Sequence, residues 1–184
     1  MYVTEDMIAW MAEQYGRPER HPFAVPVPDQ EYDFIRSTQK NGRNHDITLY
    51  ILRGDQVIVN AKHFYPPGLY RAPSGGLNLG EDFHLGVDRE TMEETGCRIE
   101  LTRFLLRTDV RFRKEDGDAI RWRSLVFLAR YVSGDFKFTD HREIREVRLA
   151  DWGEFQTFGR IMRQSDKGGL HYRAALHDAV AELL

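Results

Sequence analysis

Three glutamates stand close together in a segment that opens with two glycines and ends at a third. Glu90, Glu93 and Glu94 have the spacing i, i+3 and i+4, so a helix would place their three carboxylates on one face. Like charges at this spacing destabilise a bare helix by roughly a few tenths of a kcal/mol per pair. A hard divalent cation such as Mg2+, which takes oxygen ligands, would offset that repulsion. The segment therefore predicts a helix that binds a metal ion.

The whole segment from residue 75 to residue 97 follows a known motif. Its glycine and polar positions are Gly75, Glu81, Arg89, Glu90, Glu93, Glu94 and Gly96. In their order and spacing the chain resembles the Nudix hydrolases, whose box reads glycine-x5-glutamate-x7-Arg-Glu-U-x-Glu-Glu-x-Gly-U, where U is a bulky aliphatic residue. The two U positions depart from the motif, since they hold Thr91 and Cys97. Both still suit a buried face, threonine through its methyl group and cysteine as a small hydrophobe.

The resemblance implies a fold and a reaction. The fold is α/β, the Nudix fold, with a mixed β-sheet sandwiched between helices. The reaction is metal-dependent hydrolysis of a pyrophosphate bond in a nucleoside diphosphate linked to another moiety X, by attack of water on phosphorus. The cofactor would be Mg2+ or Mn2+, because a divalent ion offsets phosphate charge and lowers the pKa of a bound water.

The resemblance also implies roles for the charged residues of the box. Glu90 and Glu94, one helical turn apart, are the expected metal ligands. Glu93 would be a third ligand or the residue that polarises the attacking water. Arg89 would support catalysis by orienting the neighbouring carboxylates, and its plain alternative is an exposed ion pair of little energetic value.

Four further residues are candidates for the reaction centre. Glu81 would bind a second metal through water, or merely suit the positive end of the helix. The backbone carbonyl in the region of Gly75 binds metal in some relatives, so Gly75 is a candidate ligand. Several family members take a general base from a glutamate well downstream of the box. Here that base would be Glu143, which we prefer, or Glu146, and a surface role is the alternative for each.

The residues expected to contact substrate lie beside the box. Gly76 lets the backbone approach phosphate closely, since no Cβ intrudes. Tyr70 and Arg71 precede the glycine loop and are expected to reach the leaving part of the substrate. The downstream signatures of ADP-ribose, dinucleoside polyphosphate, coenzyme A and NADH hydrolases are missing. The expected partner is therefore a small phosphorylated nucleotide whose identity the sequence leaves open.

Composition and net charge argue against some other classes of function. The net charge is −3, with 26 lysines and arginines against 29 acidic residues and no long run of either sign. A dedicated nucleic-acid binder is usually strongly basic, so no dedicated nucleic-acid binding is expected. One local cluster is basic, and its members are Arg107, Arg111, Arg113 and Lys114. We interpret this cluster as a solvated face, with a phosphate or base contact as the alternative.

The cellular setting follows from cysteine usage and hydropathy. The single cysteine, Cys97, allows no intrachain disulfide and suits a reducing compartment. No apolar stretch approaches the ~20 residues of a membrane span. The first residues include Glu5 and Asp6 and lack the basic-then-apolar layout of a signal peptide. The sequence predicts a cytoplasmic protein without membrane association.

Two regions are expected along the chain. Residues 1–30 form an extension, with an amphipathic helix over Thr4–Tyr15 and a proline-punctuated, irregular stretch over Arg17–Gln30. This extension would pack on the domain, form the contact of a homodimer or shape the substrate site, and packing is the preferred alternative. Residues 31–184 form the Nudix hydrolase domain.

Within the second region, strands are expected on both sides of the box helix, and two helices are expected after them. The expected strands are Tyr32–Thr38, Ile47–Leu52, Gln56–Phe64, Ile99–Phe112, Ile120–Val132 and Glu143–Leu149. Asn41–Gly42 has the composition of a type I′ hairpin turn. Beyond the box helix, Glu154–Arg163 and His171–Leu184 are expected to be helical.

Two rival functions are weighed against hydrolysis. A nucleotide-sensing binding module on the same fold would not need the box glutamates, and this chain has kept them all. A prenyl diphosphate isomerase would need an added pair of cysteine and histidine catalytic residues, and no such pair is apparent. Hydrolysis is therefore the preferred interpretation.

Overall fold

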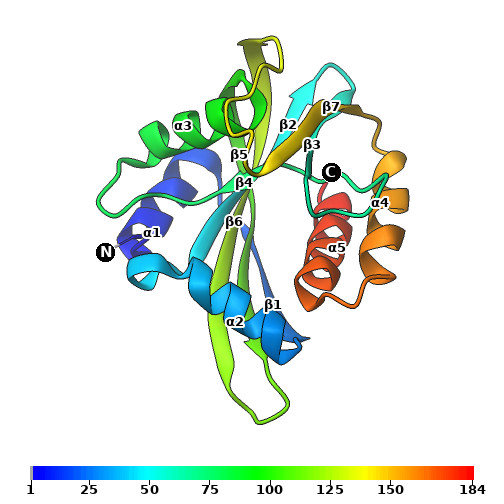
Figure 1. The fold of residues 1–184 in the computed structure, drawn as a ribbon. Helices are drawn as coiled ribbons and strands as arrows, with labels where there is room; N and C mark the ends of the chain where they lie inside the picture. The colour runs from blue at the N-terminus through cyan, green and yellow to red at the C-terminus, as the bar shows by residue number, and fades with distance from the viewer. Residues whose placement is uncertain (1) are drawn as a thin grey trace.

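The computed structural model describes residues 2–184, in which one sheet lies between two layers of helices (Figure 1). The helices are α1 (Glu5–Tyr15), α2 (Asp29–Thr38), α3 (Phe83–Thr95), α4 (Glu154–Arg163) and α5 (Gly168–Ala181), with a 3-10 turn η1 (Lys40–Gly42). The strands are β1 (Glu19–Pro26), β2 (His45–Arg53), β3 (Gln56–Lys62), β4 (Ser74–Gly75), β5 (Cys97–Arg113), β6 (Ala119–Gly134) and β7 (Ile144–Ala150). The predicted helix over 154–163 and the long strands on either side of residues 114–118 are confirmed.

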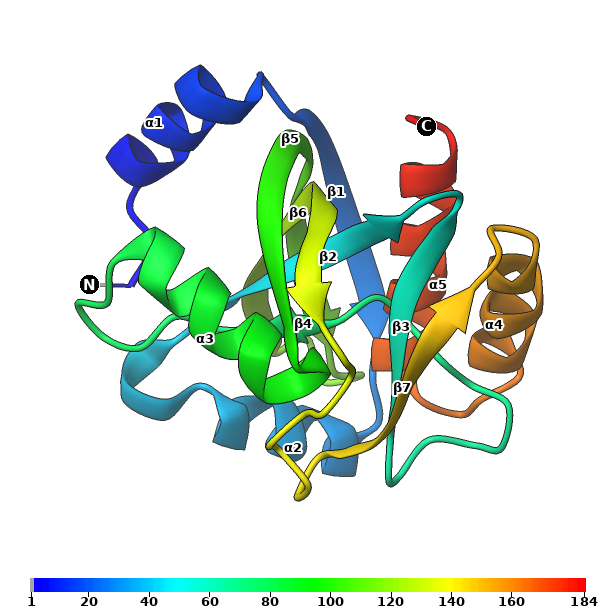
Figure 2. The ribbon, with the colours of Figure 1, turned by 90° about the horizontal axis from the view of Figure 1, so that it is seen from above.

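The sheet is mixed, as predicted. Its order is β1-β5-β6-β2-β3-β7, and the short β4 pairs with β2. β1 runs parallel to β5 and β2 runs parallel to β6, whereas β5 and β6 form an antiparallel hairpin. Because β2 is central, its side chains are buried on both faces. Seen from above, the sheet separates α1 and α3 from α4 and α5 (Figure 2).

Each face of the sheet has its own apolar core. In β2, Ile47, Leu49 and Ile51 join the cluster under α1 and α3, while Tyr50 joins the cluster under α2, α4 and α5. This alternation is the period of two that a strand imposes on its side chains. The sandwich of helix, sheet and helix that the family resemblance implied is therefore confirmed.

Residues 29–38 are helical, so the predicted strand over Tyr32–Thr38 is wrong. Asp29 and Glu31 stand in the first turn of α2, where their charges suit the positive end of the helix. Tyr32 then packs into the core, and Glu31 accepts hydrogen bonds from the backbone of Gly168 and Gly169 at 2.8 Å. These tertiary contacts outweigh the β-forming composition of the segment.

The predicted hairpin turn at Asn41–Gly42 is also wrong. Both residues have positive φ, 55° for Asn41 and 80° for Gly42, as a type I′ turn would require. No strand precedes them, however, and the turn links α2 to β2 through η1. The positive φ angles of Asn41 and Gly42 agree with the predicted turn, whereas the strand that was predicted before the turn is the helix α2.

The first thirty residues contribute to the sheet. The stretch that was predicted to be irregular contains β1, which pairs with β5 from Glu19 to Pro26 at one edge. An edge position suits Pro22 and Pro26, because proline cannot donate a ladder hydrogen bond. The predicted helix over Thr4–Tyr15 is confirmed, and Thr4 caps it. The domain boundary after residue 30 stays a prediction.

The cluster of basic residues around β5 is not one solvated face. Arg107 is 6% exposed, and its guanidinium donates to Glu5 of α1 at 2.8 and 3.1 Å. Arg107 therefore ties α1 to the sheet, and the surface interpretation is wrong for this residue.

Within residues 2–184 there is no helix long and apolar enough to cross a membrane.

The buried carboxylate of Asp46 joins several side chains on the face of the sheet that α5 covers. Asp46 accepts hydrogen bonds from Trp122 Nε1 at 2.7 Å, Ser124 Oγ at 2.5 Å and Thr48 Oγ1 at 3.0 Å, and it pairs with Arg173 Nη2 at 3.0 Å. Burial acts to raise the pKa of Asp46, but the Arg173 charge and these hydrogen bonds outweigh it. The resulting pKa lies below the ordinary value.

Asp46→Asn is expected to destabilise the protein by about 3–5 kcal/mol at pH 7, because it leaves the Arg173 charge without its partner. Since the pKa of Asp46 is lowered on folding, this stabilisation is present above the unfolded pKa of ~3.9 and is lost as pH falls through the folded pKa. Urea unfolding at pH 7 and at acid pH measures both effects.

The control is Asp178→Asn, because Asp178 forms an exposed pair with Arg163. It should lower the free energy of unfolding by no more than about 1 kcal/mol. Equal losses in the two variants would contradict the assignment.

Candidate active site

The predicted box forms a loop, a helix and a turn. Asp82 caps α3 by accepting from the backbone N–H groups of His84 and Leu85 at 2.9 and 3.1 Å. Gly96 ends the helix in the left-handed conformation, with φ of 68°. Thr91 and Cys97, the two departures from the motif, are each 1% exposed. Both therefore occupy core positions, as expected.

Arg89 lies at the centre of the box carboxylates. Its guanidinium donates to both oxygens of Glu81 at 2.8 Å, to Glu90 at 2.9 Å and to Glu93 at 3.3 Å. It also donates to the carbonyl of Gly76 at 3.2 Å. The hydrogen bonds from Arg89 hold the pKa of Glu81 at about 2, well below its usual range. Arg89 thus couples the glycine loop to the acidic face of α3.

Glu90 packs directly against the glycine loop. A Cβ placed on Gly75 would lie 2.0 Å from Glu90 Oε2, so any side chain at this position would displace the carboxylate. The backbone N–H of Gly76 donates to Glu90 Oε1 at 3.3 Å. Burial raises the pKa of Glu90 above its ordinary value, in spite of the nearby Arg89. The absence of a side chain at position 75 therefore lets the Glu90 carboxylate lie against the loop as it does here.

Glu94 is the most buried carboxylate of the box, at 5% exposure. It accepts from Asn60 Nδ2 of β3 at 2.9 Å and from the backbone N–H of Ser74 at 3.1 Å. Burial raises the pKa of Glu94, although Lys62 Nζ lies 3.8 Å away. Sequence reasoning missed Asn60 and Lys62, because neither belongs to a motif and only the position of β3 beside α3 brings them to the site.

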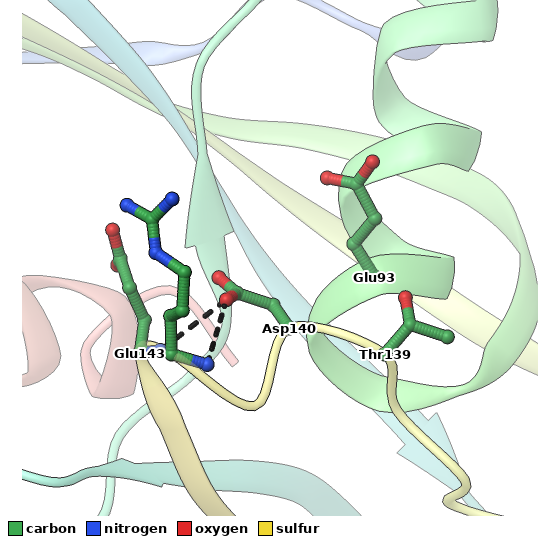
Figure 3. Close-up of a pocket in the computed structure, with 5 residues that line it drawn as sticks. Glu93, Thr139, Asp140 and Glu143 are labelled. Carbon is green, nitrogen blue, oxygen red and sulfur yellow. Dashed lines mark hydrogen bonds between the residues drawn. The ribbon is translucent and has the colours of Figure 1, made fainter.

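A cavity of about 360 Å³ opens beside the acidic face of α3. It is lined by Glu93, Thr139, Asp140, Arg142 and Glu143. Glu93 extends from α3 on one side, and Glu143 stands on the facing loop that leads into β7 (Figure 3). The backbone N–H groups of Thr139 and Asp140 donate to the carbonyl of Glu93, which holds this loop against the helix.

The two downstream glutamates have different surroundings. Glu143 borders the cavity and pairs with Lys62 Nζ at 2.5 Å. Burial acts to raise the pKa of Glu143, but the Lys62 charge outweighs it and leaves the pKa below the usual range. Glu146 instead accepts from the hydroxyl of Tyr70 at 2.6 Å and does not line the cavity. The fold therefore brings Glu143 close to the box and separates Glu146 from it.

Arg71 lies behind the glycine loop and is 5% exposed. It donates to the Tyr65 hydroxyl at 2.5 Å and to Ser74 Oγ at 2.6 Å. The backbone N–H of Ser74 also donates to Glu94, so Ser74 links Arg71 to the acidic face of α3. Tyr70, by contrast, is only partly buried and lies under the guanidinium of Arg148 at 4.1 Å.

The oxygen atoms around α3 are potential ligands for a divalent cation. Within residues 2–184, no group of three or more histidine, cysteine, aspartate or glutamate side chains is arranged to hold a metal ion, and the box carboxylates face Arg89 and Lys62. Three features nevertheless suit a hard cation: the donors are oxygens, position 75 has no Cβ, and the buried Asn60 Oδ1 has no hydrogen-bond partner. Glu90 and Glu94 are the carboxylates that would hold such an ion.

Comparison with known proteins agrees with this geometry. Two curated relatives are the NAD-capped RNA hydrolases NudC of Haemophilus influenzae (strain PittEE) and Pasteurella multocida (strain Pm70), which are 29% and 26% identical over 109 residues. The alignments cover 58% and 59% of this chain, and the chain spans 37% of the length of each relative.

A solved NUDIX hydrolase from Nitrosomonas europaea matches with a TM-score of 0.51 and 18% identity, over 76% of this chain and 90% of that chain. At this identity the likeness shows the fold. A family model described as NUDIX domain matches residues 42–169, which is more than half of the chain. The chain therefore belongs to the NUDIX domain family.

Proposed function

We propose that this protein is a metal-dependent hydrolase that cleaves a pyrophosphate bond in a nucleoside diphosphate linked to another moiety X. The observation that carries the proposal is the placement of Glu90 and Glu94. The carboxylates of Glu94, which is buried, and Glu90, which is partly buried, stand one helical turn apart at a glycine loop, and desolvation raises the pKa of each. Carboxylates that lie close together and are shielded from water have perturbed pKa values, and such groups are typical of functional sites.

Glu90 and Glu94, with Glu93 beside them, would hold Mg2+ or Mn2+. The bound ion would offset phosphate charge and activate a water molecule. Glu143 lines the same cavity as Glu93 but stands on a different segment, where it would accept the proton of the attacking water. Arg89 keeps the carboxylates in position through the hydrogen bonds described above, and Glu81 fixes the orientation of Arg89.

Gly76 and Arg71 are proposed to contact the phosphates, and Tyr70 the leaving part of the substrate. The backbone N–H of Gly76 lies beside Glu90, and Arg71 is a buried cation with no ion pair among the described residues. The relatives reported above are named NAD-capped RNA hydrolases, which supports a nucleotide-type substrate for this chain. The free thiol of Cys97 is buried, which supports a reducing setting such as the cytoplasm.

The proposal is tested with a product-resolved panel of nucleoside diphosphate derivatives. At least one is expected to be cleaved to a nucleoside monophosphate and a phosphorylated X with Mg2+ or Mn2+ present, and none with EDTA. Calorimetric binding of a nucleotide without turnover would instead favour the sensing module. Release of inorganic phosphate alone would contradict the assigned bond.

A further inference from the structure

Among the described residues that line the cavity beside α3, Arg142 is the only cation. The other lining residues are three carboxylates and a threonine, namely Glu93, Asp140, Glu143 and Thr139. Arg142 is exposed, so a ligand in the cavity can reach its guanidinium. A pyrophosphate that enters this cavity therefore meets one positively charged side chain among the residues of the lining.

The glutamates of the cavity are paired with other cations. Glu93 accepts from Arg89 Nη1 at 3.3 Å, and Glu143 pairs with Lys62 Nζ at 2.5 Å. The guanidinium of Arg142 makes neither an ion pair nor a hydrogen bond within residues 2–184. Its N–H donors are therefore available to an anion from outside the chain.

The backbone around Arg142 is held in place on both sides. Asp140 Oδ1 accepts from the backbone N–H groups of Arg142 and Glu143 at 3.2 Å each (Figure 3). The carbonyl of Glu93 accepts from the N–H of Asp140 at 2.9 Å, which attaches the loop to α3. The carbonyl of Glu143 accepts from the N–H of His63 at 3.1 Å, which attaches the loop to the segment that follows β3. Because the backbone is already ordered, binding through Arg142 costs less conformational entropy than binding through a mobile loop.

We propose that the guanidinium of Arg142 binds the non-bridging oxygens of the phosphate that water attacks. The inference rests on the proposed function, to which it adds a catalytic residue that contacts the substrate. Arg142 is the chain neighbour of Glu143, the proposed base, and both line the cavity. A guanidinium at this position therefore starts beside the place where the attacking water would lose its proton.

The contact with Arg142 would strengthen during the reaction. The oxygen of the attacking water forms a bond to phosphorus, and its proton passes to Glu143. The bond from phosphorus to the bridging oxygen breaks, and its electron pair stays on the leaving phosphate. In the transition state, charge is spread over the three equatorial oxygens of the attacked phosphate, and the forked N–H donors of an arginine can stabilise it.

Two other roles for Arg142 lead to different results. In the first, its charge acts only through Glu143. Burial acts to raise the pKa of Glu143, the Lys62 charge opposes this, and the Arg142 charge adds a smaller contribution in the same direction as Lys62. In the second, Arg142 is a solvated residue without a part in turnover. Direct contact is preferred because Arg71, the other arginine proposed to contact phosphate, is buried and does not line the cavity.

The first test measures binding without turnover. The full chain is titrated by calorimetry with the α,β-methylene analogues of ADP, GDP, CDP and UDP at saturating Mn2+. Arg142→Ala is expected to weaken binding of the tightest analogue at least about tenfold, because it removes charge-assisted hydrogen bonds to phosphate. The control Arg145→Ala removes an exposed arginine that does not line the cavity, and its affinity should stay within about twofold. Equal losses in the two variants, or no binding of any analogue by the unmodified protein, would overturn the inference.

The second test measures kcat and KM of Arg142→Ala on the best substrate of the panel, from about pH 6 to about pH 9. The expected loss in kcat is at least about 10²-fold at every pH and exceeds the rise in KM, because the contact strengthens in the transition state. Added guanidinium should restore part of the turnover of Arg142→Ala and none of that of Glu143→Gln. A loss that disappears above about pH 8 would show that Arg142 acts only through the pKa of Glu143, and it would overturn the inference.

Failure of the proposed function gives a different pattern. If the unmodified protein cleaves no member of the panel, hydrolysis is rejected, and the affinities for the methylene analogues still decide whether Arg142 binds phosphate. If the unmodified protein turns over substrate and Arg142→Ala matches it in kcat and in affinity, the proposed function stands and the inference about Arg142 is rejected.

Discussion

Glu94→Gln is expected to lower kcat/KM by about 10³-fold or more, a loss of roughly 4 kcal/mol of transition-state stabilisation. Glutamine keeps the size of the side chain and one oxygen that can accept from Asn60 Nδ2 and the Ser74 N–H. It removes the negative charge that would bind the divalent ion. The expected result is therefore a folded protein with little turnover. Steady-state assays on the best substrate of the panel, at saturating Mg2+, measure the loss.

The control for this variant is Glu100→Gln. Glu100 is an exposed glutamate of β5 that pairs with Arg130 on the surface, so its replacement should leave turnover within about twofold. Thermal unfolding in EDTA establishes that Glu94→Gln still folds, and Mg2+ should raise the melting temperature of the unmodified protein more than that of the variant. A loss below about tenfold, only ~1.4 kcal/mol, would reject Glu94 as a metal ligand.

The box could be predicted from sequence because its information is local. The spacing of Glu90 and Glu94 fixes which face they share, Asp82 begins the helix and Gly96 ends it in a conformation that glycine adopts freely. None of these properties depends on distant parts of the chain. The core positions of Thr91 and Cys97 were expected because both residues fill the aliphatic positions of the motif.

The partners of the box could not be predicted in this way. Asn60 and Lys62 meet Glu94 only because β3 pairs with β2 and passes beside the end of α3. Arg43 reaches Gly76 because α2 is a helix and delivers the chain to that side of the loop. Both contacts depend on the order and register of strands, which the periodicity of a single segment does not determine.

The errors at the N-terminal side have a common physical cause. The segment 29–38 contains aromatic and β-branched residues, and its intrinsic preference is weak compared with the contacts that Tyr32 and Glu31 make in the fold. β1 likewise becomes a strand only by pairing with β5, whose paired residues lie 87 positions further along the chain. In both cases tertiary interactions select the structure, whereas the box helix carries its own start and stop signals.

The second large loss of turnover is expected when the proposed general base, Glu143, is replaced. Glu143→Gln is expected to lower kcat by 10²–10⁴-fold, the usual contribution of a positioned acid or base. Glu143 lines the same cavity as Glu93, and the Lys62 charge keeps its pKa below the ordinary value, so it is ionised at neutral pH and can accept a proton. Single-turnover kinetics with excess enzyme isolate the chemical step from product release.

Glu146→Gln is the matched control, because Glu146 lies three residues further along the same segment but is hydrogen-bonded to Tyr70 and outside the cavity. Its replacement should change kcat by less than about threefold. Since Glu143 is proposed to act on water and not to bind the metal, Glu143→Gln should also leave the affinity for Mn2+, measured by calorimetry, unchanged. A larger loss in Glu146→Gln would transfer the role to Glu146. Reduced Mn2+ affinity in Glu143→Gln would make Glu143 a ligand instead of a base.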